Sequence, residues 1–466
     1  MGKEQIDTIC ALATAPGGAL GIIRVSGPQA FDVVSHICSV NCADCAPNTV
    51  HYTHIISPLP LEGTGVAQVI DEVMVSVFKA PKSYTGEDSV EISCHGSRYI
   101  YNKVLELLIQ NGCRMANPGE FTQRAYLNGK MDLSQAEAVA DLIASTNKAT
   151  HNIALSQLRG QFSSELSILR DQLLKLTSLL ELELDFSDHE DLEFADRTEL
   201  LSIAQTIDNR ITRLAQSFET GQALKQGIPV AIVGKTNVGK STLLNTLLKD
   251  DRAIVSDIHG TTRDTIEDTI DINGITFRFI DTAGIRQTQD EVEQIGISRT
   301  YAAIDKARIV LWLIDSLPSD TEVQEMQERC KDKSLIIIIN KMDKLNDEST
   351  KELSAFLSPL TSHLLTISAK YGTHISELES AIYESANIPT LTESDVIVTN
   401  ARHYDALTHA HSHLLRVIDG LNLQLSGDLL SEDLRMALDD LAEITGGQIT
   451  PQETLQNIFS HFCVGK

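Results

Sequence analysis

The spacing of apolar residues changes along the chain, and each spacing predicts a different kind of element. Short, continuous apolar runs predict strands buried on both faces, and they lie at 228–233, 277–280 and 335–339. Further runs with strand character lie at 21–25, 72–78 and 89–93. A helical pattern covers 98–110. We therefore expect mixed strands and helices in residues 1–118, and a mainly parallel sheet in the centre of the chain.

From about residue 119 the apolar spacing changes to steps of three and four. The clearest example is a heptad-like stripe of Leu155, Leu158, Phe162, Leu166, Leu169, Leu173, Leu176 and Leu180. We expect the stripe to lie on one long helix, which either packs inside its own domain or forms an intermolecular coiled coil. The acidic stretch 181–199 is expected to be a solvated loop or helix start. Helical patterning returns at 400–466.

The most informative motif follows the first buried run. Residues 234–241 carry two glycines, Gly234 and Gly239, followed by Lys240 and Ser241, and a helix-forming run comes next. This is the pattern of a phosphate-binding loop, in which backbone N–H groups surround phosphate oxygens. Lys240 is expected to reach the outer phosphates and Ser241 to ligate Mg²⁺. A glycine-rich turn without a ligand is the alternative that the flanking elements disfavour.

Three further boxes indicate that the nucleotide is guanine. Asp281, Thr282, Ala283 and Gly284 follow the second run; Asp281 is expected to hold the Mg²⁺ shell and the Gly284 N–H to sense the γ-phosphate. The third run is followed by Asn340, Lys341, Met342 and Asp343. A carboxylate at Asp343 can accept hydrogen bonds from guanine N–H groups, an edge that adenine lacks. The last box is Ser368, Ala369 and Lys370, whose backbone is expected to support the guanine carbonyl.

Two details concern hydrolysis. Ile285 follows Gly284 at a position where many GTPases have a glutamine that orients water, and isoleucine cannot do this. Thr262, in the stretch 253–264, is a candidate for the switch threonine that closes on Mg²⁺. Either another group orients the water, or the protein is a slow GTPase that only switches.

Composition limits the remaining classes. A chain of 466 residues is long enough for two to three domains, and its net charge of −26 argues against a broad nucleic-acid-binding face of its own. No apolar run has the length of a membrane span and the start lacks a signal-peptide pattern, so we expect no membrane association and a cytoplasmic location. Eight scattered cysteines suit a reducing compartment.

Two side-chain clusters suggest alternatives. Cys38, Cys42 and Cys45 have the spacing that holds a [4Fe–4S] cluster in radical enzymes, although no barrel pattern follows, and reduced thiols in a loop are favoured. His409 and His413 lie four residues apart on an expected helix and could form a metal pair, but a solvated helix face is favoured.

The sequence predicts a multidomain protein that combines α/β and α domains. An N-terminal α+β domain is expected at 1–118, and the first part of a helical domain at 119–218. A Ras-like P-loop GTPase domain, with a mixed but mainly parallel sheet flanked by helices, is expected at 219–386. The second part of the helical domain follows at 387–466. Insertion of the GTPase domain is plausible because the ends of a compact domain usually lie close together.

The whole chain closely resembles the MnmE/TrmE family of tRNA modification GTPases. Besides the GTPase boxes, the markers are the segments DTI at 7–9, GIIRVSG at 21–27, YTGED at 84–88, PGEF at 118–121, QAEA at 135–138 and FCVGK at 462–466. Their order and combination are specific to the family.

The resemblance implies a folate-binding N-terminal domain that forms a homodimer and uses 5-formyl- or 5,10-methylene-tetrahydrofolate. The residues that match the family's folate site are Arg24, Glu91, Lys130 and Lys466. Arginine and lysine suit the anionic glutamate tail of a folate, and a carboxylate can pair with the pterin N–H edge. Cys463, in the terminal motif, matches a reactive thiol near the folate and is assigned a catalytic role, with a structural thiol as the alternative.

The resemblance also implies K⁺-dependent hydrolysis between two GTPase domains that meet face to face. The K⁺ ligands are then Asn237, Ser256, Ile258 and Thr261. Glu293 matches the acid that orients the attacking water, and Arg286 helps to order the switch. The full nucleotide-binding set also includes neighbouring residues of these segments, namely Val238, Thr242, Asp257, His259 and Gly260.

The implied activity is modification of carbon five of the wobble uridine of certain tRNAs, giving a carboxymethylaminomethyl or aminomethyl group. The implied partners are tRNA and an FAD-dependent protein of the GidA/MnmG type, in a heterotetramer. A ribosome-assembly or RNA-associated regulatory GTPase is the alternative; it shares the nucleotide boxes but usually carries a basic RNA-binding domain, and none is visible here.

Overall fold

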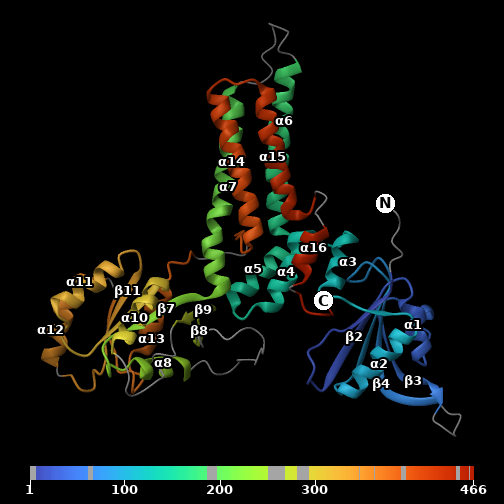
Figure 1. The fold of residues 1–466 in the computed structure, drawn as a ribbon, viewed down its shortest axis with the longest axis horizontal. Coiled ribbons are helices and arrows are strands. Elements are labelled where there is room, and N and C mark those ends of the chain that lie inside the picture. The colour runs from blue at the N-terminus through green and yellow to red at the C-terminus, as the bar shows by residue number, and fades with distance from the viewer. Residues whose placement is uncertain are drawn as a thin grey trace. The chain divides into compact units, whose positions relative to one another are not determined.

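The structure is a computed structural model of the chain. It describes residues 7–60, 67–185, 197–249, 268–280, 293–345, 347–361, 363–389, 395–447, 452–460 and 462–465. The chain groups into two compact units. One comprises residues 1–143, 157–208 and 409–466, and the other comprises 144–156 and 209–408. Figure 1 shows the elements of both units.

The first unit begins with a six-stranded sheet in the order β3-β4-β5-β2-β1-β6. Its neighbouring strands are antiparallel except for the parallel pair of β1 and β6. The strands are β1 (Ile9–Leu12), β2 (Leu20–Ser26), β3 (Thr49–Pro60), β4 (Ala67–Phe78), β5 (Ser89–His95) and β6 (Arg114–Met115). The strands expected at 21–25, 72–78 and 89–93 fall inside β2, β4 and β5, so this part of the α+β prediction is confirmed.

Two helices cover one face of this sheet, α1 (Ala30–Ile37) and α2 (Arg98–Gln110). Alternate residues of the strands, such as Ile23, Val75 and Ile92, are fully buried beneath them. The alternation is what a sheet with one packed face requires. Residues of the other register, including Arg24 and Glu91, therefore lie on the opposite face.

The rest of this unit is helical. It contains α3 (Glu120–Leu127), α4 (Leu133–Ala144), α6 (Gln161–Asp185), α15 (Gly427–Thr445) and α16 (Gln452–Ser460), with a short 3₁₀ turn, η1 (Cys42–Asp44), in the N-terminal part. Three more helices carry the chain from one unit to the other: α5 (Lys148–Leu158), α7 (Arg197–Gln226) and α14 (Ala401–Asn422).

The leucine stripe lies on two helices, so the expectation of one long helix was wrong. Leu155 and Leu158 are on α5, and the stripe from Phe162 to Leu180 is on α6. Gly160, with φ of +83°, separates the helices, because a left-handed residue interrupts the helical path and glycine adopts it without strain. The α6 part of the stripe is buried, and α6 packs against α15 of the same chain. This favours packing within the domain over an intermolecular coiled coil.

The second unit is built on a six-stranded sheet in the order β12-β11-β10-β7-β9-β8. Only β8 runs antiparallel to its neighbour, which confirms the mixed, mainly parallel sheet. Its strands are β7 (Ile228–Val233), β8 (Asp268–Ile272), β9 (Ile275–Phe279), β10 (Ile309–Ile314), β11 (Ser334–Ile339) and β12 (His363–Thr366).

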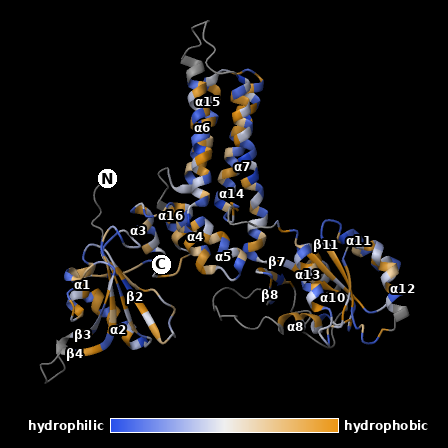
Figure 2. Ribbon diagram, turned by 180° about the vertical axis from the view of Figure 1, so that it is seen from behind, coloured by the Kyte–Doolittle hydropathy of each residue, from blue (hydrophilic) through white to orange (hydrophobic). Residues whose placement is uncertain are grey.

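Helices cover both faces of this sheet. One layer contains α8 (Lys240–Lys249) and α13 (Ile375–Ser385), and the other contains α10 (Glu293–Lys306), α11 (Asp320–Arg329) and α12 (Asp347–Leu357), with the 3₁₀ turn η2 (Ser358–Leu360). Every residue of β10 is buried, which explains its continuous apolar sequence. Figure 2 shows the hydrophobic residues concentrated on the central strands.

The multidomain α/β and α fold predicted from the sequence is therefore confirmed. The four domain boundaries remain a prediction, because the two compact units divide α5, α7 and α14 within their lengths. Within the described ranges, no helix combines the length and hydrophobicity that crossing a bilayer requires.

Candidate functional site

The phosphate loop connects β7 to α8, at the carboxyl end of a central parallel strand. Gly234 and Gly239 have φ angles of +150° and +107°. A Cβ atom on Gly234 would lie 2.4 Å from the Leu313 carbonyl oxygen, and one on Gly239 would lie 2.3 Å from Asn340 Nδ2. Both positions therefore require glycine, for conformation and for space.

Lys240 is the first residue of α8, and its side chain folds back into the loop. Its Nζ donates hydrogen bonds to the carbonyl oxygens of Gly234 at 2.6 Å and Lys235 at 2.8 Å. Burial lowers the pKa of the Lys240 ammonium. A partly desolvated cation beside the N-terminus of a helix is suited to bind an anionic phosphate.

Asn340 joins the phosphate loop to the last guanine box. Its Nδ2 donates to the Val238 carbonyl oxygen at 2.8 Å, and its Oδ1 accepts from the Ala369 N–H at 3.1 Å. The side chain is only 2% exposed. Thr246 of α8 adds a second connection, because its hydroxyl donates to the Ala369 carbonyl oxygen at 2.8 Å. The boxes at 234–241, 340–343 and 368–370 thus form one site.

Asp343 is exposed at this site, where a base can reach it. The Ser368 hydroxyl donates to Asp343 Oδ1 at 2.7 Å. This hydrogen bond is the main cause that lowers the pKa of the Asp343 carboxyl, so the group is a carboxylate at neutral pH. One Asp343 oxygen is thereby oriented by the neighbouring box, and the carboxylate can still accept from the N–H edge of guanine.

Lys341 makes two contacts that sequence reasoning missed. Its Nζ donates to the Asn237 carbonyl oxygen at 2.7 Å and pairs with Asp315 Oδ2, also at 2.7 Å. Asp315 directly follows β10, and a carboxylate at the carboxyl end of a buried central strand is the signal that could have drawn attention to it.

Several residues assigned to the nucleotide and metal site lie outside the described residues. They are Ser256, Asp257, Ile258, His259, Gly260, Thr261, Thr262, Asp281, Thr282, Ala283, Gly284 and Arg286. Glu293 is the first residue of α10, and the position of its side chain is likewise not described.

A second group of candidate residues lies on the N-terminal sheet. Arg24 and Glu91 are partners on the antiparallel strands β2 and β5, and Arg24 Nη2 lies 2.7 Å from Glu91 Oε1. Arg24 Nη1 donates to the Gly465 carbonyl oxygen at 3.2 Å, which brings the C-terminal motif to this site. The guanidinium also lies 5.4 Å from the Tyr84 ring centroid and 5.6 Å from that of Phe121.

The remaining candidate residues of the N-terminal site are Lys130, Cys463 and Lys466. Lys130 Nζ donates to the Pro81 carbonyl oxygen at 2.8 Å, so this side chain also holds the loop that carries Tyr84. Cys463 is exposed, in contrast to the other seven cysteines, which are buried. Lys466 lies outside the described part of the chain.

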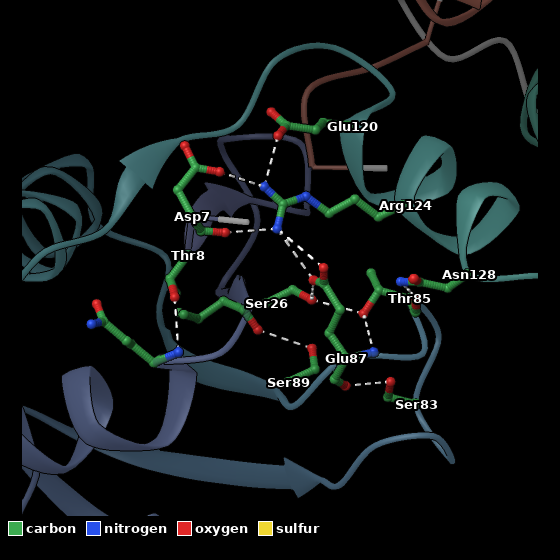
Figure 3. A network of polar contacts seen from close by, with 12 residues as sticks. Asp7, Thr8, Ser26, Ser83, Thr85, Glu87, Ser89, Glu120, Arg124 and Asn128 are labelled. Atoms are coloured by element: carbon green, nitrogen blue, oxygen red, sulfur yellow. Dashed lines mark hydrogen bonds and ion pairs between the residues drawn. The ribbon is translucent and has the colours of Figure 1, made fainter. Parts of the chain in front are cut away.

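A network around Arg124 supports this site, and the sequence reasoning did not identify it (Figure 3). Arg124 is 8% exposed and donates to the Asp7 carboxylate at 2.9 Å, to Glu120 at 3.0 Å and to Glu87 at 3.3 Å. Arg114 donates to the same Asp7 and Glu120 carboxylates. The hydrogen bond from Arg114 is the largest cause that lowers the pKa of Asp7.

The two alternative metal sites receive no support. Cys38, Cys42 and Cys45 are all buried, and burial raises the pKa of the Cys38 thiol to about 12 and that of the Cys42 thiol to about 11. His409 is exposed, whereas His413 pairs with Asp433 at 3.4 Å. Across the described ranges, no group of three or more His, Cys, Asp or Glu side chains is arranged to hold a metal ion.

Known proteins match the chain over nearly its whole length. The family profile described as "MnmE helical domain" matches residues 133–463, and "GTP-binding protein TrmE N-terminus" matches residues 8–130. Proteins named tRNA modification GTPase MnmE are 54% identical in Phocaeicola vulgatus and in Bacteroides thetaiotaomicron, with 99% of each chain covered. The relative in Porphyromonas gingivalis is 48% identical, covering 99% of this chain and 98% of its own.

Among solved structures, the G domain of the T. maritima FeoB iron transporter covers 34% of this chain and 99% of its own. The identity is 24% and the TM-score is 0.25, so this likeness carries no argument about function.

The phosphate loop and the guanine boxes, gathered at one edge of a mainly parallel sheet, define a P-loop GTPase. The matches over nearly the full length show to which family of P-loop GTPases the chain belongs. The chain belongs to the MnmE family of tRNA modification GTPases, which confirms the resemblance inferred from its motifs.

Asp343→Asn should reverse the preference for the base. The variant loses the carboxylate that accepts from guanine N–H groups, so the Kd for GDP should rise by at least roughly 100-fold. Xanthine carries a carbonyl where guanine has its exocyclic amine, so xanthosine diphosphate should bind the variant more tightly than the wild type. Equilibrium titration with fluorescent nucleotides measures both values.

Asp332→Asn is the matched control, because Asp332 is exposed and precedes β11 at the opposite edge of the same sheet. Unchanged GDP affinity in Asp343→Asn would contradict the assignment of the base site.

Proposed function

We propose that this GTPase takes part in adding a carboxymethylaminomethyl or aminomethyl group to carbon five of the wobble uridine of certain tRNAs. The observation that carries the proposal is the match to proteins named tRNA modification GTPase MnmE along 99% of the chain. The substrate is then tRNA, and the reaction takes place in the cytoplasm. Because the net charge is −26, a partner would supply much of the basic surface that tRNA binding needs.

The N-terminal site is proposed to bind 5-formyl- or 5,10-methylene-tetrahydrofolate through Arg24, Glu91, Lys130 and Lys466. The arrangement of the described residues fits such a molecule. The Arg24 guanidinium is bordered by the Tyr84 and Phe121 rings and paired with a carboxylate, so aromatic surfaces and both signs of charge meet at one place. A flat ring with a polar N–H edge and an anionic tail has matching chemistry.

When bound, the folate supplies a one-carbon unit. The chain's own residues orient it: Glu91 accepts hydrogen bonds, while Arg24 and the lysines bind anionic groups. Exposed Cys463 belongs to the same C-terminal motif as Gly465, whose carbonyl oxygen contacts Arg24, and it is proposed as a reactive thiol beside the folate. The redox step is assigned to an FAD-dependent partner of the GidA/MnmG type, in a heterotetramer.

A homodimer is proposed to form through the N-terminal sheet. The face opposite α1 and α2 carries exposed apolar side chains on its outer strands: Val50 is 56% exposed, Tyr52 62% and Met74 43%. Tyr52 and Met74 are partners across β3 and β4, so these residues form a continuous patch. A second copy of the chain would remove this apolar surface from water.

The nucleotide site is proposed to hold Mg²⁺ through Ser241 and Thr262, with Asp281 in its outer shell. K⁺ is proposed to bind between two GTPase domains, ligated by Asn237, Ser256, Ile258 and Thr261. Asn237 is exposed on the phosphate loop, and its carbonyl group is fixed by Lys341. A cation there would stabilise the charge that develops on the transferring phosphate.

The remaining catalytic roles concern the attacking water and the use of the hydrolysis energy. Glu293 is proposed to orient the water, and Arg286 to order the segment that precedes it. Hydrolysis would then drive opening and closing of the GTPase domains, and would not enter the organic reaction itself.

The modification role is tested by mass spectrometry of tRNA nucleosides from cells that lack this gene. The aminomethyl-type wobble uridine should disappear, return with the intact gene, and remain absent with Lys240→Ala, because this variant cannot hold the phosphates. An unchanged nucleoside profile in the deletion strain would refute the role. Recovery with Lys240→Ala would show that GTP is not required.

GTP turnover should be at least about tenfold faster in K⁺ than in Na⁺ at equal ionic strength, since K⁺ replaces the charge of an arginine finger. Asn237→Ala should remove most of this difference when each protein is measured at a saturating GTP concentration. Phosphate release in the two salts measures the effect. Equal rates for the wild type would exclude a K⁺-dependent mechanism.

Arg24→Ala should weaken tetrahydrofolate binding by at least about tenfold, because it removes a charge-assisted contact. Isothermal titration with 5-formyl-tetrahydrofolate gives the Kd, and GTP turnover should stay unchanged. Arg98→Ala, at the exposed start of α2, is the matched control. Wild-type affinity in Arg24→Ala would place the folate elsewhere.

A further inference from the structure

The Lys341 ammonium lies between oxygen atoms from two different elements. One is the Asn237 carbonyl oxygen in the phosphate loop, and the other is Asp315 Oδ2 at the end of β10, each 2.7 Å away. The side chains of Lys341 and Asp315 are 32% and 31% exposed. The ion pair is therefore partly shielded from water, and it connects the central strand to the phosphate loop through one lysine.

Both backbone positions that this lysine connects are left-handed. Asn237 has a φ of +63° and Lys341 a φ of +62°, and neither residue is glycine. Such conformations cost free energy and persist where surrounding contacts impose them. At Asn237, the contact is the hydrogen bond from Lys341 Nζ to its carbonyl oxygen. The next carbonyl oxygen, of Val238, is held by Asn340. Two consecutive phosphate-loop carbonyls are thus fixed by two consecutive residues.

Asp315 is the group that keeps the lysine in this position. A lysine side chain is long and flexible, and its ammonium acts as a point charge without a preferred direction. Without the carboxylate, the ammonium would gain solvation by moving towards water and away from the Asn237 carbonyl. Asn237 could then leave the left-handed conformation, and the loop N–H groups next to it would turn away from the phosphates.

We propose that Asp315 is a positioning residue of the GTPase reaction, acting through Lys341 to hold Asn237 in the left-handed conformation that shapes the phosphate loop. Asp315 has no direct contact with the nucleotide in this account. The effect on nucleotide affinity depends only on the GTPase site. The effect on K⁺ dependence rests in addition on the proposed role of the Asn237 side chain as a K⁺ ligand.

The test is a double-mutant cycle on the full-length protein with fluorescent GDP as the probe. Asp315→Ala should raise the Kd about fivefold, as expected for a partly exposed ion pair. The same substitution in a Lys341→Ala background should change the Kd little, because its effect passes through the lysine. Equal effects of Asp315→Ala with and without Lys341 would overturn the proposal.

A second cycle examines the backbone conformation. Glycine adopts positive φ without strain, so Asp315→Ala should have little effect on GDP affinity when Asn237 is replaced by glycine. A merely structural role of Asp315 would weaken binding equally in both backgrounds, and this outcome also contradicts the proposal. Asp332→Ala is the matched control, since this exposed carboxylate lies at the opposite edge of the sheet.

Asp315→Asn provides a variant with the same shape should Asp315→Ala fail to fold. Its amide oxygen can still accept from Lys341, so its GDP affinity should lie between those of wild type and Asp315→Ala. If Asp315→Asn bound GDP no more tightly than the double variant Lys341→Ala with Asp315→Ala, Asp315 would not act through this hydrogen bond. Thermal melts establish that each variant is folded.

Measuring the K⁺ requirement distinguishes failure of this proposal from failure of the proposed K⁺ mechanism. Asp315→Ala should raise the K⁺ concentration needed for half-maximal turnover, because the loop would present Asn237 less often in the correct orientation. A wild type without K⁺ stimulation would refute the K⁺ mechanism alone, and the two affinity cycles would still decide the role of Asp315.

Discussion

The buried amide of Asn340 is the interaction on which the nucleotide site depends. One side chain satisfies the Val238 carbonyl in the phosphate loop and the Ala369 N–H in the last guanine box. Leaving either backbone group buried without a partner would cost about 1–3 kcal/mol. The close approach also explains Gly239, where a Cβ atom would overlap the Asn340 amide. The parts that bind phosphate and base are therefore held in fixed relation before a nucleotide arrives.

The remainder of the GTPase unit places these loops at one edge of a buried sheet. Strands β7, β10, β11 and β12 run parallel, so their carboxyl ends share that edge, and the boxes follow three of them.

The β8–β9 hairpin is hydrogen-bonded to the start of α5. Its Gly274 carbonyl accepts from the Ala149 N–H, and Asn147 donates to Thr276. Asn147 also accepts from the Thr150 N–H, as an N-cap of α5 does. The start of α5, which comes from another part of the sequence, is thus fixed to the hairpin.

The N-terminal site depends on a different kind of contact, an ionic network beneath a loop. Helix α3 and the residues after it contact the loop at 81–88 four times: Thr122 with Tyr84, Arg124 with Glu87, Asn128 with Thr85 and Lys130 with Pro81. The loop in turn places Tyr84 beside Arg24. Two arginines share three carboxylates in this network, so both arginine charges are paired where they are partly buried.

The amino-acid sequence determined the local elements, the parallel sheet and the family. Apolar runs predict buried strands because a sheet covered on both faces excludes polar side chains, and the loop glycines predict positive φ. The family resemblance named Arg24 and Glu91 as site residues, and the structure shows that they form an ion pair. The break at Gly160 in the leucine stripe has a local cause, the left-handed conformation of one glycine, which the apolar spacing alone does not reveal. Two features were decided by the tertiary structure: the Arg124 network and the position of Asp315 beside Lys341. Both join residues far apart in the sequence, and the spacing of residues along the chain does not determine which distant groups the fold brings within hydrogen-bonding distance.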